Sequence, residues 1–79
     1  MTAAVQERIA CLRTHWCAVL GVAAAEPAQN FFELGGDSLA AMELIRRVSV
    51  GTGWELPIEA LFTVGTLAEL ESLADEGAS

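Results

Sequence analysis

Ser38 is the side chain of this sequence best placed to be chemically modified. It follows two glycines, Gly35 and Gly36, which would let the backbone of a partner approach closely. It also follows Asp37, a good N-cap for a helix, so the Ser38 hydroxyl should be exposed. A phosphodiester on this hydroxyl would lie beside the free amides and the positive dipole end of the helix. From these four residues alone, a plain loop that ends in a capped helix is the simpler interpretation.

Catalysis by the chain itself is not expected. The sequence has no lysine and no tyrosine, and its only histidine, His15, is predicted to face away from the apolar stripe of the first helix. A catalytic serine and histidine pair would have to join Ser38 to His15, and nothing in their spacing supports it. Glu33 and Asp37 are interpreted more simply as a solvated residue and a helix cap. We therefore predict that the chain is not an enzyme.

The charge disfavours several classes of partner. A net charge of -7 with only four basic residues would repel nucleic acid and anionic lipid alike. We expect protein partners with basic docking surfaces instead. The longest apolar stretch, Val19 to Ala25, is too short to span a bilayer, and no signal peptide opens the chain. The expectation is a cytoplasmic protein without membrane contact.

The two cysteines are expected to be free thiols. Cys11 and Cys17 are six residues apart on one predicted helix. The helical rise would separate their Cα atoms by about 9 Å, which is beyond the reach of a disulfide. Free thiols fit a reducing cytoplasm. Because His15 is the only histidine that could join them as a ligand, no metal site is predicted.

The composition predicts an all-α fold in a single domain. A chain of 79 residues fits one domain, and a hydrophobic fraction of 53% with only 6% aromatic residues suits packed helices. The expected domain is 1–79, with a core at about 3–75 and a frayed tail at 76–79.

Periodic apolar residues predict two long helices joined by a long loop. Steps of three and four predict a helix from Ala3 to Leu20, ended by Gly21. The stretch from Val22 to Gly36 has no such period and should be an ordered loop, pinned by Phe31, Phe32 and Leu34. The second helix should begin after Asp37 and fade near Val50 and Gly51. Its expected buried stripe consists of Ala41, Leu44, Ile45 and Val48.

Two shorter helices are predicted after these. Trp54 should cover the core, and Pro57 should occupy the first turn of a short helix that runs to about Phe62. A capping box of Thr66 and Glu69 predicts a last helix that ends near Asp75.

The segment Asn30 to Leu39 carries a longer motif. Its residues, Asn-Phe-Phe-Glu-Leu-Gly-Gly-Asp-Ser-Leu, closely resemble the core motif of peptidyl carrier (thiolation) domains of nonribosomal peptide synthetases. These domains belong to the phosphopantetheine-binding, acyl carrier protein-like superfamily. The resemblance continues at fitting distances through Leu44 and Ile45, Leu61 and Phe62, and residues 66–70. It implies an acyl carrier protein-like four-helix bundle, with a long loop between the first two helices.

The resemblance also implies a role for Ser38. This residue would carry a covalent 4′-phosphopantetheine group, taken from coenzyme A by a separate, magnesium-dependent phosphopantetheinyl transferase. Gly36 and Asp37 would be the flanking motif. The chain would accept aminoacyl groups from an adenylation enzyme, hold them as thioesters, and deliver them to condensation, tailoring or thioesterase enzymes. A monomer that serves natural-product (antibiotic) biosynthesis is expected.

Two positions depart from the family pattern, and two alternative functions stay open. Gln29 stands where such domains often have an acidic residue, and Gly65 where a proline is common. Both are expected to loosen their surroundings slightly. An acyl carrier protein of polyketide or fatty-acid synthesis is the nearest alternative, although Phe31, Phe32 and the double glycine favour the peptidyl type. The other is a helical interaction module without a prosthetic group.

Helical phase predicts a partner-binding face beside Ser38. If the stripe of the second helix faces inward, Leu39, Met42 and Arg46 project to one side. Leu39 could instead fold back on the loop, whereas Met42 is harder to bury and suits varied partners. Phe62 is expected to belong to the core. Glu43 and Arg47 flank the face; a solvated surface is the simpler interpretation for both, and a role in partner choice is the alternative.

Overall fold

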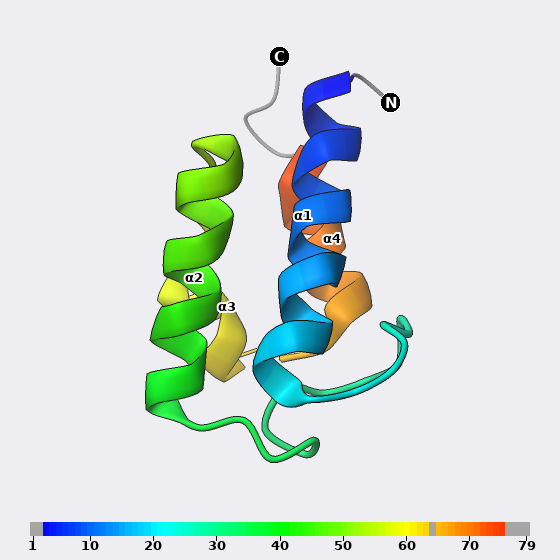
Figure 1. Cartoon of the computed structure of the whole chain (residues 1–79), viewed down its shortest axis with the longest axis vertical. Coiled ribbons are helices and arrows are strands. Elements are labelled where there is room, and N and C mark those ends of the chain that lie inside the picture. Colours follow the sequence, from blue (N-terminus) through cyan, green and yellow to red (C-terminus); the bar gives the residue numbers. More distant parts are fainter. Residues whose placement is uncertain (1–2, 64, 76–79) are drawn as a thin grey trace.

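The computed structural model describes residues 3–63 and 65–75, which form the bundle of four helices in Figure 1. The helices are α1 (Ala3–Leu20), α2 (Ser38–Thr52), α3 (Ile58–Thr63) and α4 (Leu67–Asp75). Among the described residues there is no strand, only an isolated bridge between Asn30 and Thr66. The predicted all-α bundle with a long first loop is confirmed. The tail at 76–79 lies outside the described residues.

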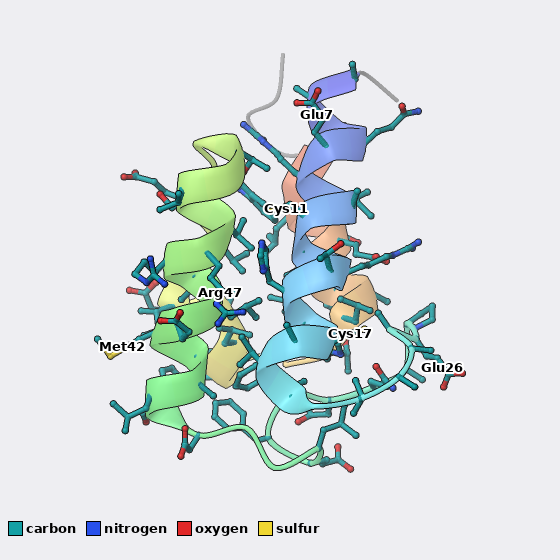
Figure 2. All side chains as sticks on the ribbon, in the orientation of Figure 1. Glu7, Cys11, Cys17, Glu26, Met42 and Arg47 are labelled. Carbon is teal, nitrogen blue, oxygen red and sulfur yellow. The ribbon has the colours of Figure 1, made fainter. Side chains whose placement is uncertain are left out.

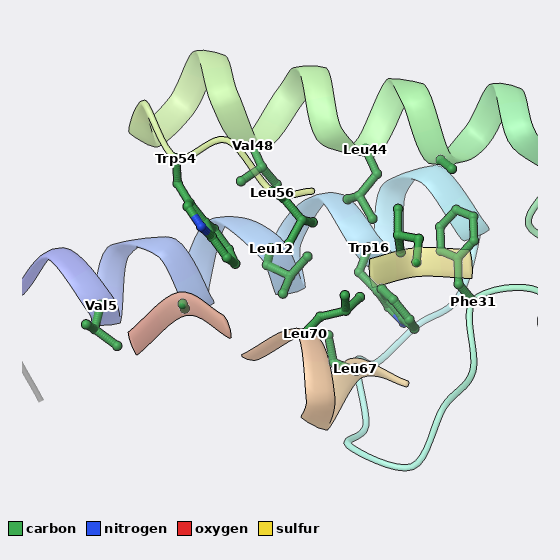
Figure 3. Close-up of a cluster of buried hydrophobic side chains, with 13 residues drawn as sticks. Val5, Leu12, Trp16, Phe31, Leu44, Val48, Trp54, Leu56, Leu67 and Leu70 are labelled. Carbon is green, nitrogen blue, oxygen red and sulfur yellow. The ribbon is translucent and has the colours of Figure 1, made fainter. Parts of the chain in front are cut away.

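The core lies where the helices meet. α1 makes its largest interface with α2 and a second one with α4. Figure 3 shows apolar side chains from these helices converging with Trp54 and Leu56 of the segment before α3. Trp54 is 7% exposed and covers the core as predicted. Of the predicted stripe, Ile45 is half-buried and the other three residues are buried. The buried set is Val5, Leu12, Trp16, Phe31, Ala41, Leu44, Val48, Trp54, Leu56, Leu61, Leu67, Leu70 and Ala74.

Glycines in the left-handed region end both long helices. Gly21 has a φ of 69° and donates its amide to the Cys17 carbonyl at 2.8 Å, as the predicted stop requires. Gly53 has a φ of 76° and donates to the Ser49 carbonyl at 2.8 Å. α2 therefore runs to Thr52 rather than fading near Val50, because Gly51 stays helical and the left-handed turn forms at Gly53.

The two short helices begin close to their predicted positions. Pro57 lies just before α3, and its carbonyl accepts a hydrogen bond from the Ala60 amide at 3.1 Å. At the start of α4, the Thr66 hydroxyl oxygen accepts from the Glu69 amide at 3.4 Å. The same hydroxyl donates to the Glu69 carboxylate at 2.7 Å. Thr66 and Glu69 thus form the predicted cap. The Glu69 carboxylate bonds to the Thr66 hydroxyl, whereas in the usual capping box it bonds to the backbone amide of the capping residue.

The bundle has a long axis of 33 Å. α2 begins at one end of this axis, and α1 begins and α4 ends toward the other (Figure 1). The long loop between α1 and α2 crosses the end of the bundle where α2 begins. The start of α2 is therefore separated from the start of α1 and from the end of α4 by much of the length of the molecule.

His15 differs from its prediction. It was expected to face away from the packed side of its helix, but it is half-buried, and its Nδ1 atom is buried with no hydrogen-bond partner among the described residues. The expectation is wrong because α1 packs against both α2 and α4, so that residues beside its apolar stripe, such as His15, are also partly covered. Cys11 and Cys17 are half-buried free thiols, as predicted, and burial raises the pKa of the Cys11 thiol.

Other predicted absences concern membranes and metals. Within 3–63 and 65–75, no helix is both long enough and apolar enough to cross a membrane. The same residues contain no group of three or more side chains that could hold a metal ion.

Candidate functional site

Ser38 is the first residue of α2 and is exposed. Asp37 precedes it in extended conformation, with φ -128° and ψ -174°, and its Oδ1 atom accepts a hydrogen bond from the Ala40 amide at 2.8 Å. The Asp37 carbonyl accepts from the Ala41 amide at 2.9 Å, which begins the helical ladder. Asp37 is therefore the predicted N-cap. The Ser38 hydroxyl lies in the first turn, where backbone amides have no intrahelical acceptor and favour an anion.

The two glycines before Asp37 have different tasks. Gly35 adopts a φ of 94°, a region that favours glycine, although a Cβ atom there would meet no other group within 4 Å. A Cβ atom on Gly36 would overlap the ring of Phe31 and lie 2.7 Å from the Phe31 carbonyl oxygen. The Gly36 amide also donates to that carbonyl at 3.0 Å. Gly36 therefore lets the chain pass directly over Phe31 just before α2 begins.

Gln29 ties the long loop to the bundle. Its side-chain oxygen accepts from the indole N–H of Trp16 at 2.9 Å and from the Glu26 amide at 3.0 Å. Its side-chain nitrogen donates to the Ala24 carbonyl at 3.1 Å. The expected loosening at this position is therefore not observed: the glutamine makes three hydrogen bonds where a carboxylate could only accept.

Gly65 joins the loop to the segment before α4. Its φ of 72° is unavailable to proline, whose φ is fixed near -65°. Its carbonyl accepts from the Phe31 amide at 2.8 Å, and a Cβ atom there would lie 2.7 Å from Nδ2 of Asn30. The Asn30 side-chain oxygen accepts from the Phe32 and Glu33 amides at 3.0 and 3.2 Å. Glycine at 65 thus permits a close junction rather than loosening the chain.

The predicted partner-binding face is exposed beside Ser38. Leu39 is 77% and Met42 57% exposed, and Arg46 is exposed on the same helix. Figure 2 shows Met42 pointing away from the bundle. The alternative in which Leu39 folds back on the loop is wrong. A groove of about 400 Å³ adjoins the face, lined by Met42, Ile45, Arg46, Ser49, Val50, Glu55 and Ile58.

Phe62 corrects the prediction that it belongs to the core. Its side chain is 52% exposed, and its ring stacks on Phe32 with centroids 5.2 Å apart and planes 20° apart. Phe32 in turn meets the edge of Phe31, with centroids 5.4 Å apart. α3 has six residues, too few for an apolar period to show which face is buried. The structure adds Phe62 to the apolar surface near the start of α2.

The charged residues of α2 form a small network rather than separate solvated side chains. The Glu43 carboxylate accepts from Arg46 at 2.6 Å and from Arg47 at 2.9 Å. Hydrogen bonds from Arg46 and then Arg47 lower the pKa of Glu43 to about 2. Two of the four basic residues of the chain are therefore paired with one carboxylate beside the exposed apolar face.

The geometry defines a small helical domain that presents an exposed serine hydroxyl at the start of a long helix, beside exposed apolar side chains. Residues 11–74 match the protein family described as "Phosphopantetheine attachment site". The chain belongs to this family of carrier proteins, whose prosthetic group is a covalently attached 4′-phosphopantetheine. An exposed hydroxyl at the positive end of the α2 dipole suits such a phosphodiester.

Curated relatives of the chain are peptide synthetases. It is 46% identical over 66 residues to phosphinothricin tripeptide synthetase PhsC of Streptomyces viridochromogenes. The aligned region covers 84% of this chain and 6% of that protein. The chain is 42% identical over 76 residues to tyrocidine synthase 3 of Brevibacillus parabrevis, which covers 96% of this chain and 1% of that protein. The chain therefore spans only a small part of each of these relatives.

A solved structure supports the fold. The chain superposes with a TM-score of 0.73 on BlmI, described as a type-II acyl-carrier-protein from Streptomyces verticillus involved in bleomycin biosynthesis. The two chains are 26% identical, and the match covers 86% of this chain and 82% of BlmI. The resemblance to the acyl carrier protein-like bundle is thereby confirmed.

Proposed function

We propose that Ser38 is the attachment serine and that the chain is a peptidyl carrier, which holds aminoacyl or peptidyl groups in nonribosomal peptide synthesis. The position of Ser38 carries the proposal. Of the three serines within the family match, Ser38 and Ser72 are exposed, and only Ser38 lies at the start of a long helix. Ser49 is half-buried, and the Ser72 hydroxyl donates to the Ala68 carbonyl at 3.1 Å within α4.

The residues around Ser38 supply position and recognition. The Ser38 oxygen would form a bond to phosphorus of coenzyme A as the nucleotide part leaves, and the transferase would accept the hydroxyl proton. Asp37 holds the start of α2, and Gly36 lets the preceding chain pass over Phe31. When bound, phosphopantetheine supplies the thiol that holds the cargo as a thioester. We propose that the chain itself catalyses no step.

Several enzymes would bind the face formed by Leu39, Met42 and Arg46. The partners we propose are a phosphopantetheinyl transferase, an adenylation enzyme, and downstream condensation, tailoring or thioesterase enzymes. The exposed apolar side chains of the face and of Phe62 offer them contact area, and the net charge of -7 favours basic docking surfaces. Free Cys11 and Cys17 support a reducing compartment such as the cytoplasm.

The attachment step is tested by intact-mass measurement after incubation with coenzyme A and a transferase of broad specificity. The parent chain, Ser49→Ala and Ser72→Ala should all gain the mass of the arm, whereas Ser38→Ala should not. A Ser38→Ala variant that gains the same mass would exclude Ser38. A parent chain that gains none would favour a helical interaction module without a prosthetic group.

The type of carrier is tested in a second step. The relatives named as peptide synthetases favour an aminoacyl cargo, and the fold shared with BlmI keeps an acyl carrier protein of polyketide or fatty-acid synthesis as the alternative. The loaded chain should accept cargo from adenylation enzymes and not from acyltransferases. Charging by acyltransferases alone would reverse this assignment.

A further inference from the structure

We infer that Gln29 is a positioning residue for the modification of Ser38, a role that rests on the proposed function of Ser38. Gln29 lies nine positions before Ser38 in the sequence and does not belong to the glycine and serine motif. It would act by fixing the loop that determines where α2 begins.

Gln29 joins three parts of the fold at one point. Its side-chain amide binds Trp16 of α1 and the loop backbone at Glu26 and Ala24, over distances of 2.9 to 3.1 Å. Its backbone carbonyl accepts from the Leu67 amide of α4 at 3.0 Å. The loop is thereby held to α1 through the side chain of this residue and to α4 through its backbone.

A continuous series of contacts leads from Gln29 to the start of α2. The Trp16 side chain is fully buried, so its indole N–H needs the acceptor that Gln29 provides. The Trp16 ring meets the edge of Phe31, with centroids 5.6 Å apart and planes 66° apart. Gly36 packs against the Phe31 ring, and its amide donates to the Phe31 carbonyl. The next residue, Asp37, caps α2.

The glutamine amide is suited to this place because it accepts and donates at once. The Trp16 indole and the Glu26 amide both require an acceptor, and the Ala24 carbonyl requires a donor. A carboxylate has no hydrogen for Ala24, and a hydrocarbon of the same length satisfies none of the three. Loss of the amide would release the Trp16 ring and, through Phe31, the segment before α2.

The expected defect is in the chemical step rather than in docking. Transfer to Ser38 requires its oxygen to lie in line with phosphorus in the transferase, and a displacement of about 1 Å can slow such a step by about 100-fold. The exposed face on Leu39, Met42 and Arg46 does not touch Gln29 in any of the contacts above. Loss of Gln29 should therefore lower kcat for loading and leave KM for the carrier essentially unchanged.

The test compares Gln29→Ala and Gln29→Met with Val5→Ala, which removes core volume near the start of α1. Loading rates are measured against carrier concentration with saturating coenzyme A and a fixed, limiting amount of transferase, together with urea unfolding of each variant. We expect both Gln29 variants to lose roughly 10- to 100-fold in kcat. Val5→Ala should keep the parent kcat, because partial unfolding only lowers the concentration of folded carrier and raises the apparent KM.

Each outcome decides the inference. An unchanged kcat for the Gln29 variants overturns it, as does an equal loss of kcat in Val5→Ala. If Gln29→Ala does not fold, Gln29→Met decides, since it retains the volume of the side chain. A parent chain that is never loaded overturns the proposed function and this inference with it, whereas a loaded parent with normal kcat in Gln29→Met overturns this inference alone.

Discussion

Asp37 shows what one residue contributes at the start of α2. Its carboxylate accepts the Ala40 amide at 2.8 Å, so Asp37→Ala leaves that donor without its partner. We expect a loss of about 1 kcal/mol in the free energy of unfolding, measured by urea unfolding. Asp37→Asn keeps a side-chain acceptor and should be close to the parent. Equal stability of Asp37→Ala and the parent would show that another group caps the helix.

Glu43 gives a pH dependence whose sign follows from its pKa. The two arginines lower that pKa from 4.5 to about 2 in the folded chain. Its contribution to stability is therefore complete above about pH 4.5 and is lost as the pH falls toward 2. Glu43→Gln should be less stable than the parent at pH 7, and the difference should shrink between pH 4.5 and 3 in urea unfolding experiments.

The contribution of Glu43 to the free energy of unfolding should be small, since its ion pairs with Arg46 and Arg47 lie at the surface and are screened by salt. Glu59→Gln is the matched control: it removes an exposed carboxylate that has no arginine partner among the described residues. A difference that grows on acidification, or an equal effect at Glu59, would contradict the assignment to the arginine network.

At the scale of helices, the surface of α2 separates folding from docking. Met42 is 57% exposed, so Met42→Asp should change stability by less than about 0.5 kcal/mol. Transfer of cargo to a partner enzyme should slow markedly, because a charge in a desolvated contact opposes association. The measurements are circular dichroism melting and transfer rates from the loaded carrier.

Thr14→Asp is the control for Met42→Asp, since Thr14 is exposed on α1. It adds the same charge away from the proposed face and should leave transfer unchanged. An early melt of Met42→Asp would assign the residue to the core, and transfer at the parent rate would remove it from the partner face.

The length of each element determined how well it could be predicted. α1 and α2 span several turns, so their apolar residues repeat often enough to identify the buried face, although the pattern ended α2 too early, near Val50 instead of Thr52. α3 has six residues, and the exposure of Phe62 could not be inferred from so short a pattern. The Asp37 cap was predictable because it depends on neighbours in sequence. The bond between Trp16 and Gln29 was not, since it forms only when the loop folds back on α1.

At the scale of the molecule, the described residues form one compact body. Their radius of gyration of 11.2 Å is close to the ~11.6 Å expected for a folded domain of about this length. The core draws on all four helices, on Phe31 of the long loop, and on Trp54 and Leu56 of the segment before α3. Trp16 of α1 and Phe31 of the long loop pack together within this core. A change that displaces the loop should therefore also lower the stability of the bundle.

The separation of the start of α1 from the start of α2 has a consequence for how the molecule can be anchored. Because α1 begins away from Ser38 along a 33 Å axis, a chain fixed to a bead through a biotin at the start of α1 should present the serine outward. Biotinylated chain on streptavidin should gain the arm at nearly the rate of free chain, measured by mass after elution. A chain anchored through a cysteine introduced at Glu33, in the loop next to Ser38, should be blocked. The distance that the thiol of the arm can reach from the anchor would thus include the length of the domain as well as the length of the arm.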